Sequence, residues 1–243
     1  MLASDSQGTD TSGGDLAFAT KHTVEKLYPL GTHIAWGGTG SAGVIQRFAH
    51  FCSTVAQEQL EQPIEELRGS LATYQRSLQQ QVRHEVMEGF YGQQVPALGV
   101  LFAGYTGGRG WILELTPGGE DTVYDEYYAV GSGSTFARQA MTSVAHYDLM
   151  TRNLVEAEVI AWRALDGCIQ ASAWGIGHPI WMYTVTADGA RALDENELRS
   201  VRDAVNAWKA AEHDSLLGLG LGAPLPASDA PADMGLDPVP EQN

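Results

Sequence analysis

A run of closely spaced glycines is the part of the sequence best suited to chemistry with a phosphate or an oxyanion. The segment Gly38–Gly43 (GTGSAG) fits the pattern G-x-G-x-x-G and stands between a predicted strand and a predicted helix. A dinucleotide site would also need a second parallel strand ending in an acid about 20 residues further on. Glu58, Glu61, Glu65 and Glu66 all fall within helical spacing there. Nucleotide binding is therefore a remote alternative, beside close packing of strand and helix or an oxyanion site built from backbone N–H groups.

The remaining reactive residue types form no pattern of their own. The segment Gly131–Ser134 (GSGS) is not a nucleophile elbow, because no serine has glycine two positions before it and two after it. The seven histidines show no H-x-x-x-H or H-E-x-x-H spacing, so we expect no metal site. Cys52 and Cys168 stand among apolar neighbours and are predicted to be buried free thiols. Asp5 and Lys26, taken singly, have the types expected at any solvated surface.

The charge balance excludes several classes of partner. The 243 residues carry 14 Lys+Arg and 30 Asp+Glu, a formal net charge of −16, with no basic run. We therefore expect neither nucleic acid nor an anionic membrane surface as a partner. The sequence has no apolar run of about 18 residues and no signal peptide at its start, which predicts a soluble, cytoplasmic protein.

The elements that would position these residues follow from the apolar periodicity. Strand pieces come first, then two helices broken at Pro63, a group of strands, two helices, a hairpin and a last helix. The expected helices span 44–60, 64–86, 135–146, 154–171 and 194–208; the expected strands span 1–5, two pieces within 17–36, then 95–105, 111–115, 123–130, 180–186 and 190–193; residues 6–14 are expected to form a loop. This order predicts an α+β fold, a four-layer αββα sandwich, over residues 1–213. Residues 214–243, rich in Pro, Gly, Ala and Asp, are expected to form a disordered acidic tail.

Several short segments together resemble proteasome β-type subunits, most closely those of the actinobacterial 20S particle. They are ASDSQGT from Ala3, VEKLY from Val24, TGSA from Thr39, AVGSGS from Ala129 and the helix start at Glu156. The similarity runs from Met1 to Trp208. It implies the N-terminal-nucleophile hydrolase fold, an αββα sandwich, of which we expect this chain to lack the first strand.

The resemblance also implies a set of site residues. In that family an N-terminal threonine supplies the nucleophilic hydroxyl and, through its free amine, the base. Asp5 and Lys26 match the acid and the lysine beside that threonine, Gly40 matches the glycine whose N–H forms the oxyanion hole, and Ser132 matches the serine that holds the amine. Gly8, Val24, Tyr28, Gly38 and Ala42 fall where the family lines its specificity pocket. Gly38 would leave this pocket deep enough for a large apolar side chain.

Three departures from the family pattern bear on activity. The nucleophilic threonine is absent, since the family's first strand would precede Met1 and neither Thr9 nor Thr11 can replace it. Val44 stands where many members have an acid, and the segment 171–177 lacks the family's Asp-x-x-Ser pair. We therefore predict that the chain as written is inactive, and that the longer protein is either a threonine peptidase or a non-catalytic paralogue.

The function that follows from the resemblance is intracellular protein degradation. The expected activity class is a threonine-type endopeptidase acting on unfolded polypeptide, without a cofactor. The expected partners are other β-type and α-type subunits in stacked rings.

Overall fold

The computed structural model describes residues 1–10, 20–89, 97–145, 153–171 and 175–219. The strands are β1 (Leu2–Asp5), β2 (Gln7–Asp10), β3 (Thr20–Thr23), β4 (Leu27–Leu30), β5 (Ile34–Gly40), β6 (Leu98–Thr106), β7 (Arg109–Leu115), β8 (Asp121–Tyr124), β9 (Ile180–Thr186) and β10 (Gly189–Ala192). The helices are α1 (Ala42–Cys52), α2 (Gln57–Leu60), α3 (Ile64–Gly89), α4 (Ser134–Val144), α5 (Leu154–Ala171) and α6 (Glu195–Gly218). The chain divides into two compact units, Met1–Val205 and Asn206–Asn243, and the first of them carries all the features that follow.

Two antiparallel sheets form the centre of the first unit. One has five strands in the order β4-β5-β6-β7-β8, and the other has three in the order β1-β9-β10. Strands β2 and β3 form a separate two-stranded ribbon. Strand β6 is buried along its first seven residues because it has neighbours on both sides and packing on both faces. This explains why the sequence there is continuously apolar rather than alternating.

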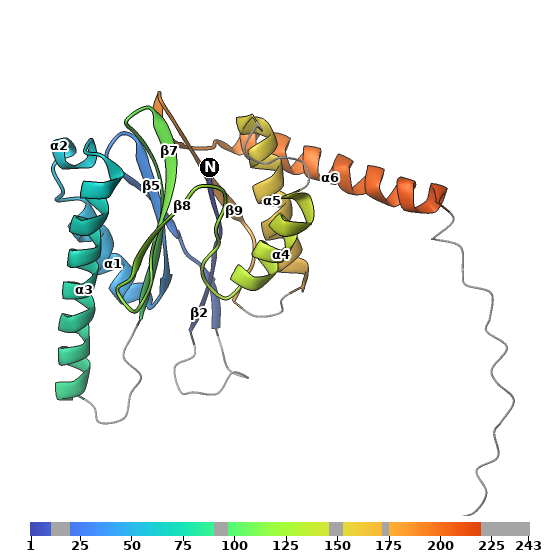
Figure 1. Cartoon of the computed structure of the whole chain (residues 1–243). Coiled ribbons are helices and arrows are strands. Elements are labelled where there is room, and N and C mark those ends of the chain that lie inside the picture. Colours follow the sequence, from blue (N-terminus) through green and yellow to red (C-terminus); the bar gives the residue numbers. More distant parts are fainter. Residues whose placement is uncertain (11–19, 90–96, 146–152, 172–174, 220–243) are drawn as a thin grey trace, which may run out of the picture. The chain divides into compact units, whose positions relative to one another are not determined.

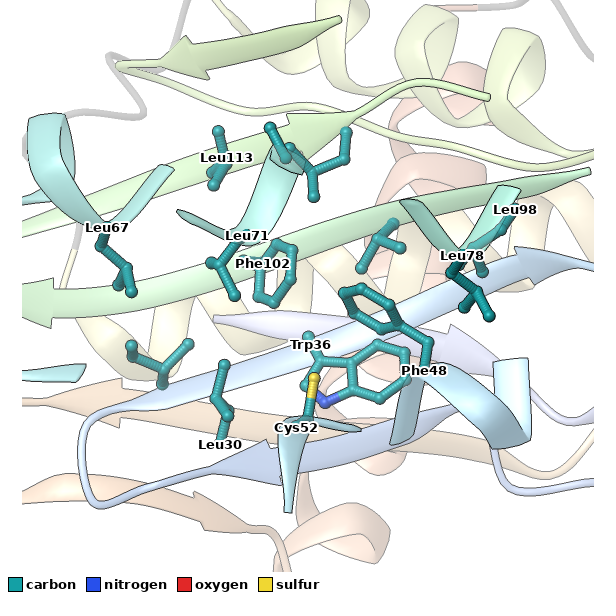
Figure 2. Packing of buried hydrophobic residues seen from close by; sticks show 14 of the residues in the cluster. Leu30, Trp36, Phe48, Cys52, Leu67, Leu71, Leu78, Leu98, Phe102 and Leu113 are labelled. Carbon is teal, nitrogen blue, oxygen red and sulfur yellow. The ribbon is translucent and has the colours of Figure 1, made fainter. Parts of the chain in front are cut away.

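Three apolar clusters define four layers. The largest lies between the helices α1 and α3 and one face of the five-stranded sheet, where Trp36, Phe48 and Phe102 pack together (Figure 2). A second lies between the two sheets and includes Leu2, Leu27 and Leu101. A third lies between α5 and the outer face of β1 and β9. In Figure 1, α1 and α3 lie on one side of the sheets and α4 and α5 on the other, which confirms the predicted αββα sandwich.

The structure differs from the predicted elements at five places. In place of the two strand pieces expected within 17–36 it has three strands, β3, β4 and β5, and β5 continues to Gly40. The expected loop at 6–14 contains β2, and the expected helix 44–60 ends at Cys52 and resumes as the short α2. The hydroxyls of Ser53 and Thr54 donate to the carbonyls of His50 and Phe51, a local pairing that competes with the helix. The expected strand 123–130 ends at Tyr124, where the chain turns so that Tyr124 stacks on Tyr128 with ring centroids 3.8 Å apart.

The fifth difference concerns the end of the last helix. α6 continues to Gly218, past the position at which the sequence predicted a tail. Residues 220–243 of that expected tail lie outside the described residues. The same is true of residues 11–14, 17–19, 95–96, 146 and 172–174, on which other predictions from the sequence fall. The division of the chain at 213/214 therefore stays a prediction.

Candidate active site

Asp5 and Lys26 form an ion pair at the end of β1. The Lys26 Nζ donates to both carboxylate oxygens of Asp5, at 2.9 and 3.0 Å. Their side chains are 21% and 14% exposed for Lys26 and Asp5 respectively, so water screens the pair only in part. The two residues are far apart in the sequence and reach one another because β1 ends beside the segment that leads into β4.

Backbone donors hold the Asp5 carboxylate in place. Its Oδ2 accepts hydrogen bonds from the N–H groups of Gln7, at 2.9 Å, and Gly177, at 3.2 Å. Between them the backbone of Ser6 donates to the Gly177 carbonyl at 3.1 Å and accepts from the Val24 N–H at 2.7 Å. Three donors from three segments make four hydrogen bonds to this one carboxylate and fix its orientation, which presents the Lys26 ammonium at a defined position.

The segment 175–177 connects this ion pair to the turn that carries Ser132. Gly175 has φ +71° and lies so close to Ser132 that a Cβ on it would be 3.3 Å from the Ser132 Oγ. A Cβ on Gly133 would come within 2.5 Å of Ile176. On the other side of the turn, the Cys168 Sγ donates to the Gly133 carbonyl at 3.6 Å. The turn 131–134 is thus packed between 175–177 and α5.

Gly40, at the end of β5, has a conformation that only glycine adopts without strain. Its φ is +116°, and a Cβ would stand 2.0 Å from the carbonyl oxygen of Ala97. The same Ala97 carbonyl accepts the Ser41 N–H at 3.2 Å, which closes the start of α1 onto the start of β6. The neighbouring Thr39 Oγ1 lies 3.3 Å from the position of a Cβ on Gly131, so this turn also meets the turn of Ser132.

The structure therefore brings Asp5, Lys26, Ser132 and Gly40 to one end of the two sheets, some by direct contact and the others through intervening residues. Asp5 and Lys26 touch directly, whereas Ser132 and Gly40 are joined to them through 175–177 and Thr39. Ser132 and Gly40 are both exposed.

The residues predicted to line a specificity pocket lie around β4, β5 and the start of α1. Val24 precedes β4, Tyr28 lies in β4, Gly38 lies in β5 and Ala42 begins α1. Gly8 lies in β2, where it pairs with His22. The Tyr28 ring stacks on Trp36 with centroids 4.7 Å apart, and its hydroxyl donates to the Glu25 carbonyl at 2.8 Å. The expected roles of these residues stay predictions.

Neither cysteine has the properties of a nucleophile. Burial raises the pKa of the Cys168 thiol, and the nearby charge of Asp5 raises it further. Burial raises the pKa of Cys52 to about 12. Both thiols are free and protonated at neutral pH, so neither supplies a thiolate for covalent catalysis.

Sequence reasoning missed the part played by the segment Gly175–Gly177. The sequence of this segment is notable only for lacking an acid, whereas in the structure it contributes a backbone N–H to Asp5 and close contacts to the turn of Ser132. The only signal in the sequence is the pair of glycines that flanks Ile176 directly after a predicted helix. Such a pair indicates close backbone approach without saying to which segment.

Among the described residues, no group of three or more His, Cys, Asp or Glu side chains could hold a metal ion. A shallow depression of about 580 Å³ lies between the end of α1 and α3, away from Asp5 and Lys26. It is lined by Phe51, Glu66, Gly69, Ser70, Thr73, Tyr74 and Ser77. No helix within the described ranges is long and apolar enough to cross a membrane.

The layers define a class of fold. Two packed antiparallel sheets with helices on both outer sides are the αββα sandwich of the N-terminal-nucleophile hydrolase fold. A solved structure with this fold, Anbu (ancestral beta-subunit) from Yersinia bercovieri, superposes with a TM-score of 0.65 at 15% identity, covering 92% of this chain and 93% of that one.

The chain belongs to the proteasome subunit family. The family model "Proteasome subunit" matches residues 1–176, which is well over half of the chain. A curated relative, "Proteasome subunit beta 2" of Thermomonospora curvata, is 28% identical over 215 residues, covering 84% of this chain and 71% of that protein. The expected family and fold are thereby confirmed.

Proposed function

We propose that this protein is a β-type subunit of a 20S-like core particle and works as a threonine-type endopeptidase in intracellular protein degradation. The observation that carries the proposal is the ion pair of Lys26 with Asp5, whose carboxylate is held by two backbone N–H groups. Such a fixed cation beside a hydroxyl favours the deprotonated form of that hydroxyl. A surface ion pair that serves stability alone does not require its ammonium to be held at a fixed position.

The nucleophile would be the hydroxyl of an N-terminal threonine beside Lys26. Within the described residues β1 pairs with β9 alone, so one edge of β1 is open. A strand joined to β1 by a hairpin would run antiparallel to it, and its first residue would lie level with Asp5 at the far end. That position is within reach of the Lys26 ammonium. We propose that the catalytically active form of the protein carries its threonine at this position.

The proposed chemistry assigns each residue one task. The threonine hydroxyl attacks the peptide carbonyl carbon, its proton passes to the threonine's own amine, and the Gly40 N–H donates to the oxygen that becomes negative. Ser132 orients the amine. The leaving amine takes up the proton, and water then hydrolyses the ester that remains on the threonine.

The test combines the true N-terminus with an activity measurement. Protein expressed from the complete gene is sequenced from its N-terminus and assayed on fluorogenic peptides with a threonine-directed covalent inhibitor. We expect an N-terminal threonine and inhibitor-sensitive hydrolysis. Lys26→Met should lower kcat by about 10²-fold or more. Arg47→Met, which breaks the exposed ion pair with Glu85, should leave kcat unchanged. Hydrolysis without an N-terminal threonine would refute the proposed mechanism.

A non-catalytic paralogue is the second candidate, and the place of Val44 favours it. Val44 is 4% exposed and belongs to the cluster between α1 and the five-stranded sheet. Many family members have an acid at this position, and here the position is buried away from water and holds an apolar side chain. This part of the family's site is therefore lost. Complete protein that assembles but neither hydrolyses peptides nor reacts with the inhibitor would establish this candidate.

Assembly and location belong to the same proposal. We propose stacked rings with other β-type and α-type subunits, unfolded polypeptide as substrate, no cofactor and a cytoplasmic location. Family membership supports these assignments, and the acidic balance of the chain makes nucleic acid and anionic membranes poor partners.

A further inference from the structure

The space that Gly38 opens beside β5 lies on the side of α1. Residues two apart in a strand face the same way, so Gly38 faces the same layer as Trp36, which is fully buried against α1 and α3. Tyr28, the register partner of Trp36 on β4, stacks on it from the same face. A side chain entering beside Gly38 would therefore pass between Tyr28 and the first turn of α1.

Ile45 already occupies the space that the missing Cβ leaves. A Cβ built on Gly38 would meet the Ile45 Cγ1 at 3.0 Å, its Cγ2 at 3.2 Å and its Cδ1 at 3.4 Å. All three outer carbons of Ile45 thus lie against the backbone of Gly38. The expectation that Gly38 leaves a deep pocket does not take account of this side chain.

The position of Ile45 is fixed from two directions. Its backbone N–H donates to the Ser41 carbonyl at 3.0 Å, in the first turn of α1 directly after Gly40. Its side chain is half-buried and packs against the cluster of Trp36 and Phe48. Helical side chains lean toward the N-terminus of their helix, which places this one over the end of β5.

We propose that Ile45 is the floor of the specificity pocket and restricts the residue before the cleaved bond to small or branched apolar side chains such as Val and Leu. Aromatic side chains are excluded because the carbon atoms of Ile45 stand where a ring would enter. Tyr28 cannot widen the pocket, since its stack on Trp36 and its bond to the Glu25 carbonyl hold it at both ends. This inference rests on the proposed peptidase function and names the substrate class of that site.

The experiment compares Ile45→Ala with Ile112→Ala. Ile112 is also half-buried, but it packs between the two sheets, so its variant removes the same atoms away from Gly38. Protein from the complete gene is assayed on fluorogenic peptides that differ only in Val, Leu or Phe before the cleaved bond. The corresponding product peptides, ending in a free carboxylate, are titrated by NMR on the same proteins. Thermal unfolding checks that both variants are folded.

We expect Ile45→Ala to raise the Phe-to-Leu ratio of kcat/KM by about tenfold or more, because a few carbon atoms in an apolar pocket change selectivity by that order. Ile112→Ala should leave the ratio unchanged. Hydrolysis with an unchanged ratio in Ile45→Ala would overturn the role of Ile45 and leave the peptidase function intact.

The titrations separate the two proposals if no hydrolysis occurs. Stronger binding of the Phe-ending product in Ile45→Ala alone would support the pocket floor while the peptidase function fails. Absence of hydrolysis together with equal binding in both variants would overturn both.

Discussion

The Asp5 carboxylate accepts four hydrogen bonds, two from the Lys26 side chain and two from backbone N–H groups. An ion pair that is only partly exposed contributes more than a surface pair, because less water competes with it. Removal of one partner leaves the other charge poorly compensated. The pair therefore allows a measurement of its energy that needs no catalytic activity.

Asp5→Asn, Lys26→Met and the double variant form a cycle that measures this energy. We expect a coupling free energy of about 1 to 3 kcal/mol in urea unfolding, since both partners lie largely out of water. The same cycle on the exposed pair Arg47 and Glu85 should give less than about 0.5 kcal/mol. Equal coupling in the two pairs would show that Asp5 and Lys26 are ordinary surface charges.

The buried thiol of Cys52 makes stability depend on pH in the alkaline range. Burial raises its pKa from the ordinary 9.0 to about 12. Below pH 9 the folded and unfolded chains both hold this proton, so its contribution is fully present. Above pH 9 the unfolded chain loses the proton first, and stability falls until the folded chain loses it too.

Cys52→Val, which keeps an apolar side chain of similar size, should remove this dependence. From pH 9 to pH 10 the wild-type free energy of unfolding should fall by about 1 kcal/mol more than that of the variant. Burial also raises the pKa values of Tyr28, Tyr124 and Tyr183, which are present in both proteins and cancel in the comparison. The pKa of Tyr74 is raised by burial and, to a smaller extent, by the charge of Cys52, so only this smaller part differs between the two proteins. Parallel pH curves would show that Cys52 does not titrate in this way.

Helix α3 holds the start of β6 through a buried glutamine. Gln75 is fully buried, and its Nε2 donates at 2.8 Å to the carbonyls of both Leu98 and Thr116. Gln79, one turn further on, also donates to the Leu98 carbonyl, at 3.1 Å. Because Leu98 is the register partner of Gly40, this helix supports the strand end on which Gly40 depends.

Gln75→Leu should therefore destabilise the fold. It removes two hydrogen bonds and leaves the Thr116 carbonyl without this donor, at a cost of about 1 to 3 kcal/mol in urea unfolding. Gln81→Leu on the exposed face of α3, where Gln81 donates to Glu85, should change stability by less than about 0.5 kcal/mol. A loss no larger in Gln75→Leu than in Gln81→Leu would contradict the supporting role of this side chain.

β1 is an edge strand of the three-stranded sheet, since among the described residues it pairs with β9 alone. Trp181 on β9, the register partner of Ser4, is 40% exposed beside it. An unpaired edge next to an exposed aromatic ring favours association with another strand.

The 243-residue chain should therefore not run as a 26.1 kDa monomer in light scattering coupled to size exclusion. Trp181→Lys, which places a charge beside this edge, should lower the measured mass. Val155→Lys, at a 66% exposed position on α5, should not. A monomer at all concentrations would contradict the prediction.

The layers could be predicted from the sequence because each has its own periodicity. The contacts that bring the segments of the site together could not be predicted. Trp36, Phe48 and Leu71 lie at helix or strand spacing, and they form one cluster as that spacing requires. The contact of Gly177 with Asp5 joins segments that are far apart in the sequence. The contact of Ile45 with Gly38 depends on the direction in which one side chain points. A single sequence does not encode such contacts in any local pattern.

The crowding at Gly40 has a consequence for how sequences of this kind diverge. A side chain there would collide with the Ala97 carbonyl, so selection for folding alone preserves the glycine, even in a copy whose catalysis has been lost. Exchange of both members of the Asp5 and Lys26 pair for apolar residues costs folding far less, because no lone charge remains. Genetic drift in an inactive lineage would thus erase the ion pair first. Retention of the glycine therefore indicates only that a chain folds, whereas retention of the ion pair indicates that it still catalyses a reaction.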